Sequence, residues 1–222
     1  MLNIKERIYL MRDANTEGYE ELDLIDMTGL IDTVLPEPTL VEFYRNLKER
    51  ELVWNGEIDD SMIEIGMYIR KWNREDKGLP AEERKPIKLF INSDGGYVDT
   101  VMNVINIIEV SKTPVYTIGL GRVYSAGGLL LMAGHKRYIF KDTTCLIHDG
   151  SSAAFGNIGK LIDSLEFTRK RESKMKDYIL SRTKITEEEY DDNYRKDWFI
   201  FANEMISYGI ADEIITDIDV VV

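Results

Sequence analysis

The stretch Gly121-Arg-Val-Tyr-Ser-Ala-Gly127 is a glycine turn between an apolar run, residues 114–120, and a run of small residues and leucines, residues 126–133. We expect a strand, a turn and a helix in that order, which places Ser125 at the N-terminus of a helix. Backbone N–H groups and the positive end of the helix dipole favour a developing oxyanion at that position. Ser125 is therefore a candidate nucleophile. From this turn alone, the alternative is a helix N-cap, a frequent position for serine.

The same order of strand, glycine turn and helix repeats along the chain on both sides of this turn. Hydrophobic periodicity predicts strands at 51–54, 85–91, 114–119, 136–140, 144–148 and 214–215. It also predicts helices at 41–49, 59–72, 98–108, 125–133, 158–181 and 202–208, and the capping box Thr186-Glu-Glu-Glu189 predicts another helix that begins near 186. This alternation indicates an α/β protein with a largely parallel sheet. Residues 73–84 are highly charged, and we expect them to form a solvated loop.

Composition limits the class of protein. The chain has 222 residues, of which 44% are apolar, enough for one domain with a sizeable core. Its 40 acidic and 28 basic residues give a net charge of −12, which disfavours binding to nucleic acid or to an anionic membrane. Cys145 is the only cysteine, and its apolar neighbours indicate a buried thiol. Without a signal peptide or an uninterrupted apolar span, a soluble cytoplasmic protein is expected.

A nucleophilic serine needs a general base, and the chain contains only two histidines, His135 and His148. His148 ends the apolar run Leu146-Ile-His148, which places it at the sheet edge where ligands bind in α/β folds. The alternative for His148 is a histidine packed in the core or at its rim. His135 lies beside Lys136 and Arg137 in a predicted surface turn. His148 is therefore the candidate base.

A second glycine turn, Asn92-Ser-Asp-Gly-Gly96, follows the predicted strand at 85–91. Two such turns at one edge of a sheet can each supply a backbone N–H group to an oxyanion hole, here from Gly96 and from Ala126. The alternative is a turn in which Gly95 and Gly96 serve only to allow a positive φ.

Taken together, these stretches resemble the proteolytic subunit of the Clp protease. The resemblance rests on Phe90-Ile-Asn-Ser-Asp-Gly-Gly96, on Gly121-Arg-Val-Tyr-Ser-Ala-Gly-Gly128 and on Leu146-Ile-His148. The family has Ile-Asn-Ser-Pro-Gly-Gly, Gly-x-x-x-Ser-x-Gly and Met-Ile-His-Gln-Pro at these places. The similarity extends over about residues 43–216 and includes Tyr208-Gly-Ile-Ala-Asp212, where the family has Tyr-Gly-Leu-Val-Asp.

The resemblance implies the α/β fold shared by Clp proteases and crotonases, with repeated β-β-α units, a mostly parallel sheet and a protruding handle helix. It also implies a serine endopeptidase that hydrolyses unfolded polypeptides inside an oligomeric chamber. Ser125 would be the nucleophile and His148 the base. Asp197, in Lys196-Asp-Trp-Phe-Ile-Phe-Ala202, would complete the triad. The family's protease subunit needs no cofactor and no metal, because ATP belongs to its partner.

The resemblance further implies an assembly. Residues 1–42 would form an N-terminal arm and residues 43–222 the peptidase domain, with the handle at residues 150–184. Seven subunits would form a ring, and two stacked rings would form the homo-oligomer. A hexameric ATP-driven unfoldase would dock in a cleft near the ring face. Candidate residues of this docking cleft are Phe90, Tyr138 and Phe140.

Several positions depart from the family pattern. Asp94 replaces a proline in the second turn, and its carboxylate disfavours an oxyanion unless it points outward or pairs with a base. Asp149 replaces a glutamine, and it competes with Asp197 as a partner for His148, although adjacent residues of a strand face opposite sides. Lys196 stands where the family has an arginine used in ring–ring contacts. Trp198 replaces a polar residue.

Three other functions are alternatives to a serine endopeptidase. A non-catalytic ring subunit with the same fold is favoured by Asp94, Asp149 and Trp198. A crotonase-type acyl-CoA enzyme shares the architecture and the paired N–H groups, but it does not need the serine, histidine and aspartate set. A signal-peptide-type peptidase with a Ser–Lys dyad needs a membrane anchor and a buried catalytic lysine, and neither is evident in the sequence.

Overall fold

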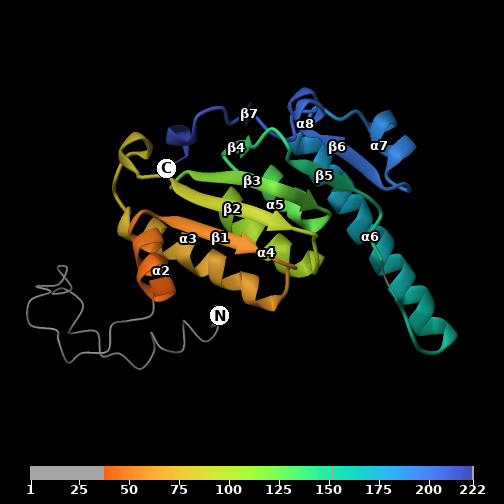
Figure 1. The fold of residues 1–222 in the computed structure, drawn as a ribbon. Helices are drawn as coiled ribbons and strands as arrows, with labels where there is room; N and C mark the ends of the chain where they lie inside the picture. The colour runs from red at the N-terminus through yellow and green to blue at the C-terminus, as the bar shows by residue number, and fades with distance from the viewer. Residues whose placement is uncertain (1–37, 152, 222) are drawn as a thin grey trace, which may run out of the picture. The chain divides into compact units, whose positions relative to one another are not determined.

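Figure 1 shows the computed structural model of the chain, which describes residues 38–151 and 153–221. The chain divides into two units, residues 1–49 and residues 50–222, and each is described by itself. In the first unit, the described residues form helix α2, Pro38–Lys48, with proline at the first helical position. The helix predicted at 41–49 is confirmed with an earlier start. Most of the predicted N-terminal arm lies outside the described residues.

The second unit is built on a seven-stranded sheet. Its strands are β1 Glu51–Asn55, β2 Ile87–Ser93, β3 Val115–Tyr124, β4 Lys136–Ile139, β5 Thr144–Ile147, β6 Trp198–Phe201 and β7 Glu213–Ile214. The order β1-β2-β3-β4-β7 forms the main path, while β5 pairs with β3 and β6 pairs with β5. Every pairing is parallel except that of β5 with β6. The predicted α/β class with a largely parallel sheet is confirmed.

Helices follow most strands, as the repeated pattern predicts. They are α3 Ile63–Glu75, α4 Val98–Glu109, α5 Ala126–Met132, α6 Ile158–Arg182, α7 Glu187–Asn193 and α8 Ala202–Ser207, with short 3-10 helices at Asp60–Met62, Ala81–Glu83 and Ile218–Val220. Helices α3, α4 and α5 pack side by side over the sheet (Figure 1). Alternate residues of β2 are fully buried, which places this strand at the centre of the core.

Strand β3 is longer than predicted because it contains a bulge. Ile91 of β2 pairs with Gly119 of β3, but Ser93 pairs with Val123, so β3 holds two more residues than β2 between these pairs. Before the bulge β3 pairs with β4, and after it β3 pairs with β5. The bulge therefore places Arg122 opposite the turn that follows β2.

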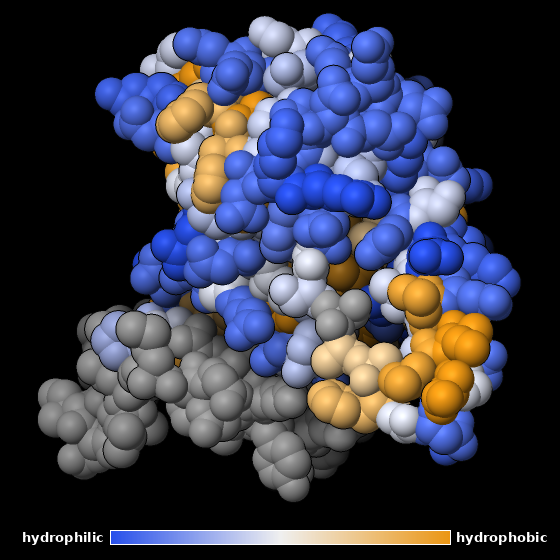
Figure 2. Space-filling view, turned by 90° about the vertical axis from the view of Figure 1, so that its right-hand side faces the viewer, coloured by the Kyte–Doolittle hydropathy of each residue, from blue (hydrophilic) through white to orange (hydrophobic). Residues whose placement is uncertain are grey.

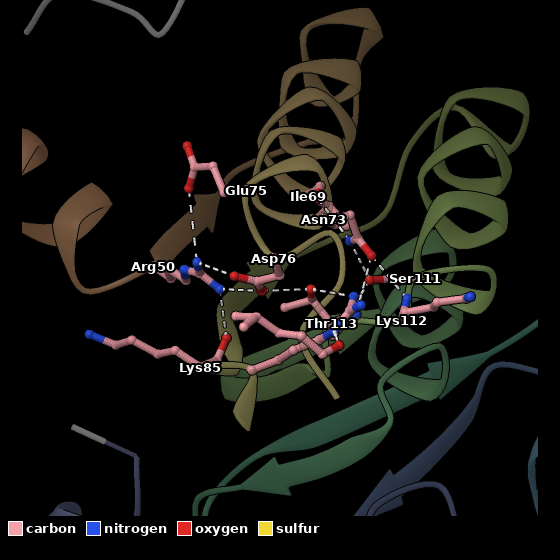
Figure 3. Close-up of polar contacts among 11 residues, drawn as sticks. Arg50, Ile69, Asn73, Glu75, Asp76, Lys85, Ser111, Lys112 and Thr113 are labelled. Carbon is pink, nitrogen blue, oxygen red and sulfur yellow. Dashed lines mark hydrogen bonds and ion pairs between the residues drawn. The ribbon is translucent and has the colours of Figure 1, made fainter. Parts of the chain in front are cut away.

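The solvated loop predicted at residues 73–84 is confirmed only in part. Residues 77–83 are exposed, but the segment begins inside α3 and buries two charged side chains. Asp76 is 3% exposed and Arg84 is 9% exposed. The guanidinium of Arg50 donates to both carboxylate oxygens of Asp76, at 2.7 and 2.8 Å (Figure 3). The Thr113 hydroxyl donates to the same carboxylate at 2.8 Å. Paired charges can be buried in this way, and charge content alone does not reveal it.

This buried network joins the amino ends of three strands. Arg50 precedes β1, Lys85 precedes β2 and accepts a hydrogen bond from Arg50 through its carbonyl, and Thr113 precedes β3. Asn73 extends the network, since its amide nitrogen donates to the Ser111 hydroxyl at 2.6 Å (Figure 3). The hydrogen bond from Arg50 holds the pKa of the Asp76 carboxyl below its ordinary value, against the opposing effect of burial.

Helix α6 is buried near its C-terminus. Its buried residues are Tyr178 and Ile179, and the Tyr178 hydroxyl donates to the carbonyl of Leu129 in α5 at 3.0 Å. The N-terminal half of α6 extends beyond the sheet (Figure 1). Its exposed large apolar side chains are Ile158, Leu161, Ile162, Leu165 and Phe167. Figure 2, viewed from the side on which α6 projects, shows apolar surface gathered low on this face. Such a patch on a monomer is typical of an interaction surface.

Candidate active site

Ser125 lies in a sharp turn between β3 and α5. Its φ of 52° and ψ of −121° lie outside the regions that residues with a side chain ordinarily adopt. Its N–H donates to the carbonyl of Leu146 in β5 at 2.8 Å, and its carbonyl accepts from the N–H of Gly128 at 2.9 Å. A strained strand-to-helix turn of this kind presents a nucleophilic serine in several hydrolases.

The Ser125 side chain does not cap α5. The residue occupies the N-cap position, but its hydroxyl makes no capping hydrogen bond. By contrast, the side chain of Asn157 accepts from a backbone N–H of α6, and Thr186 forms the predicted capping box of α7. The N-cap interpretation of Ser125 is therefore wrong, and its hydroxyl is available for other chemistry.

The second glycine turn, residues 92–96, lies directly against the Ser125 turn. A Cβ atom on Gly95 would lie 2.8 Å from the Cβ of Ser125 and 2.9 Å from the carbonyl oxygen of Tyr124, so no side chain fits there. At Gly96, a Cβ atom would overlap the carbonyl oxygen of Ile58. The φ values of Gly95 and Gly96 are 104° and 142°. These glycines therefore provide both a backbone conformation and a close approach.

Gly96 and Ala126 carry the two N–H groups predicted for an oxyanion hole. Among residues 38–151 and 153–221, neither N–H donates a backbone hydrogen bond. The N–H of Ala126 has no partner because this residue begins α5. The N–H of Gly96 donates to no backbone carbonyl of the described residues, because Ile58 pairs with the two neighbours of Gly96 instead. The N–H of Ile58 donates to the carbonyl of Gly95, and the carbonyl of Ile58 accepts from the N–H of Tyr97. Both groups are therefore available to bind an oxygen atom.

His148 is positioned by the same strand that holds the backbone of Ser125. Tyr124 pairs with Leu146 in the ladder of β3 and β5, and the hydrogen bond from Ser125 to Leu146 continues that ladder. His148 follows β5 directly, and its side chain is 26% exposed. Within the described part of the chain, no hydrogen bond joins the Ser125 and His148 side chains.

Strand β6, which the sequence analysis missed, brings Asp197 to His148. β6 runs antiparallel to β5 with Trp198 opposite Ile147, so Asp197 and His148 occupy the next position beyond the ladder. Asp197 Oδ1 lies 3.8 Å from His148 Nδ1, longer than a hydrogen bond, and the Asp197 side chain is 70% exposed. The run Trp198-Phe-Ile-Phe201 was the available signal, because aromatic and β-branched residues favour strands.

Ser125, His148 and Gly96 line one cleft with a volume of about 710 Å³, within the usual range for a ligand site. Its apolar lining includes four side chains from α5 and α6, which are Leu129, Met132, Met175 and Ile179. The charged residues of the lining are Glu57, Asp94, Asp149, Arg171 and Glu172. The cleft therefore combines an apolar wall with the candidate nucleophile and base.

Two acidic departures from the family pattern have clear structural positions. Asp94 pairs with a base, since its Oδ1 lies 2.6 Å from Nε of Arg122. Asp149 is exposed at the cleft, and among the described residues His148 forms its ion pair with Asp197 rather than with Asp149. Asp197 is thus the carboxylate that the fold brings to the histidine.

The three predicted docking residues lie close together on the sheet. Tyr138 is 3% exposed and packs with Ile215 and Val221, and the partly buried Phe90 and Phe140 pack against the same cluster. Most of the accessible surface of this group therefore belongs to the two phenylalanines. Their role in docking stays a prediction.

The other histidine and the cysteine take no part in this cleft. His135 Nδ1 accepts a hydrogen bond from the N–H of Val115 at 3.1 Å. Cys145 is buried in β5, and burial raises the pKa of its thiol to about 12. Within the described ranges, no group of three or more His, Cys, Asp or Glu side chains is arranged to hold a metal ion. None of the helices described is long and apolar enough to cross a membrane.

The sequence is similar to those of known proteins. The family model described as Clp protease matches residues 39–217. The ATP-dependent Clp protease proteolytic subunit 2 of Treponema pallidum (strain Nichols) is 30% identical over 177 residues, which cover 79% of this chain and 86% of that protein. The chain therefore belongs to the Clp protease family.

Proposed function

We propose that this protein is a serine endopeptidase that hydrolyses peptide bonds of unfolded polypeptides, as the proteolytic subunit of a Clp-type protease. The observation that carries the proposal is the position of Ser125. Its hydroxyl caps no helix, its backbone is held in a strained turn, and it lines the same cleft as His148. Family membership supports the same reaction.

In the first half of the reaction, the Ser125 hydroxyl oxygen attacks the carbonyl carbon of the substrate peptide bond. His148 accepts the hydroxyl proton as general base. The negative charge that develops on the carbonyl oxygen is stabilised by the N–H groups of Gly96 and Ala126. His148 then donates its proton to the leaving amine, which leaves an acyl-enzyme.

In the second half, water attacks the ester carbonyl, and His148 again accepts a proton and returns it to Ser125. Asp197 orients the imidazole and stabilises its protonated form. The separation of 3.8 Å between Asp197 and His148 is compatible with this role, because catalytic hydrogen bonds often tighten only when substrate is bound.

The protein acts as part of an assembly in this proposal. Residues 43–222 form the peptidase domain, and α6 with the preceding segment forms the handle through which two heptameric rings stack. The exposed apolar side chains of α6 support an oligomer, since a second copy would remove them from water. A hexameric ATP-driven unfoldase would deliver unfolded chains, with docking through Phe90, Tyr138 and Phe140. The printed name of the Treponema pallidum relative, an ATP-dependent protease subunit, supports such a partner.

A non-catalytic ring subunit is the second candidate. It is favoured by the absence, in the described part of the chain, of a hydrogen bond between Ser125 and His148 and by the exposure of Asp197. Such a subunit would assemble with catalytic copies and would not react with a serine-directed probe.

Labelling with a fluorophosphonate distinguishes these functions. We expect the assembled protein to be labelled, and the Ser125→Ala variant to remain unlabelled while keeping the same oligomeric state. Equal lack of labelling in both assembled proteins would favour the non-catalytic subunit. Acyl-CoA turnover that survives in the Ser125→Ala variant would favour a crotonase-type enzyme instead.

A further inference from the structure

Two contacts tie the turn at residues 92–96 to the strand that leads into Ser125. Asn92 Oδ1 accepts a hydrogen bond from the backbone N–H of Arg122 at 3.1 Å. Asp94 Oδ1 lies 2.6 Å from Nε of the same arginine. Arg122 therefore contacts the neighbouring turn through both its backbone and its side chain.

The bulge in β3 makes these contacts possible. The two extra residues of β3 interrupt its pairing with β2 between Gly119 and Val123, and Arg122 lies within this interruption. A residue in a bulge can be aimed away from the regular ladder. Here the bulge directs the guanidinium to a carboxylate 28 positions earlier in the chain (122 − 94 = 28).

The electrostatic consequence concerns the oxyanion. Asp94 lies two residues before Gly96 and lines the cleft with Ser125. An uncompensated carboxylate in the same cleft opposes the negative charge that forms on the substrate carbonyl oxygen. The guanidinium of Arg122 balances that carboxylate, and it does so from the strand that ends at the nucleophile.

We propose that Arg122 is a positioning residue for the oxyanion hole. Arg122 neutralises Asp94 and holds the turn at 92–96 against the Ser125 turn. This inference rests on the proposed serine endopeptidase function. Because the oxyanion exists only in the transition state, the effect belongs to kcat rather than to KM. The pair is partly exposed, at 62% for Asp94 and 47% for Arg122, so a modest effect is expected.

A double-mutant cycle tests the inference on a short fluorogenic peptide. We expect Arg122→Gln to lower kcat about fivefold, the size typical of one partly exposed charge, with KM within about twofold of the wild-type value. Adding Asp94→Asn to that variant should restore at least half of the loss, because it removes the carboxylate that the arginine balanced. High salt should also reduce the deficit of Arg122→Gln, since it screens exposed charges.

Two further variants serve as controls. Arg122→Lys keeps the positive charge without the guanidinium geometry, and it should retain more activity than Arg122→Gln. Lys136→Gln removes a cation from the exposed ion pair with Glu213, at 3.4 Å on the β4 and β7 side of the sheet, and it should leave kcat unchanged. Thermal unfolding of each variant shows whether it is folded.

The outcomes separate the inference from the proposed function. If Arg122→Gln and the double variant are equally impaired, or if only KM changes, then Arg122 does not act through the charge of Asp94 and the inference is wrong. If the wild-type protein shows no peptidase activity that depends on Ser125, the proposed function is wrong. Ser125-dependent activity with equal kcat in all Arg122 and Asp94 variants also overturns the inference and leaves the function intact.

Discussion

The amino ends and the carboxyl ends of the parallel strands form two edges of the sheet, and these edges are built in opposite ways. At the amino ends of the strands, Arg50 and Asp76 form a bidentate ion pair that is buried and completed by Thr113. At the carboxyl ends, His148 and Asp197 are 3.8 Å apart, and the aspartate is largely exposed. Tight, desolvated polar contacts therefore maintain the fold at one edge. Open, loosely paired groups at the other edge remain available to a substrate, as in other α/β proteins.

The largest expected effect is on chemistry at the carboxyl edge. We expect His148→Ala to lower kcat by about 10⁴-fold or more, because the serine loses its only base. The free energy of unfolding should change by less than about 1 kcal/mol, since the side chain is partly exposed and makes no buried hydrogen bond to any described residue. Peptidase assays and urea unfolding measure the two quantities. A loss of stability much larger than about 1 kcal/mol would show that the carboxyl edge also maintains the fold.

The next effect is on stability at the amino edge. Asp76→Asn removes the buried carboxylate that pairs with the Arg50 guanidinium and leaves only the more exposed Glu75 carboxylate, at 3.9 Å. We expect a loss of about 3 kcal/mol in the free energy of unfolding. The kcat of the folded variant should stay within about twofold of the wild-type value, because the site is at the other end of the strands. Glu213→Gln, in an exposed pair, is the control and should cost less than about 1 kcal/mol. Equal losses of stability in Asp76→Asn and Glu213→Gln would show that burial does not make the Arg50–Asp76 pair more important than an exposed pair.

A somewhat smaller effect is expected for the third member of the proposed triad. Asp197→Asn should lower kcat about 10²-fold, less than the roughly 10⁴-fold loss when a buried orienting aspartate is replaced. The exposure of Asp197 is the reason for the difference. Steady-state kinetics on a short peptide gives the value. A loss of 10⁴-fold would mean that the His148–Asp197 pair closes and loses water when the protein assembles or binds substrate.

The smallest expected effect is a dependence of stability on acid pH. The pKa of Asp76 is lower in the folded protein than its ordinary value of 3.8, so the folded state binds this proton more weakly than the unfolded state. The stabilisation is present above the unfolded pKa and is lost as pH falls from about 4 through the folded value. We expect the free energy of unfolding to fall between about pH 5 and pH 2, and we expect this part of the loss to be absent from Asp76→Asn. An identical pH dependence of stability in the wild-type protein and in Asp76→Asn would contradict a role for the Asp76 carboxyl.

Much of the fold could be predicted because its signals are local. The glycine turns, the apolar runs and the capping box of α7 each lie within a few residues, and they gave most of the strands and helices in order. Ser125 and His148 were found for the same reason. Three contacts leave no local signal, because each depends on residues far apart in the chain, and Asp197 was assigned to His148 only through the family resemblance. Arg50 meets Asp76 after 26 positions, Asp94 meets Arg122 across two turns, and Asp197 reaches His148 only through the pairing of β5 with β6.

That pairing also determines which parts of the site move together. The hydrogen bond from Ser125 to Leu146 couples the nucleophile to β5, and His148 is the first residue after the same strand, so a displacement of β5 carries both. β6 pairs only with β5 in the described sheet, and Asp197 is attached to it. Loss of β6 from the sheet edge would therefore remove the orienting carboxylate while the serine and histidine keep their shared support. Under the proposed mechanism, the site could thus lose its third member by itself and would then have a level of activity between full function and none.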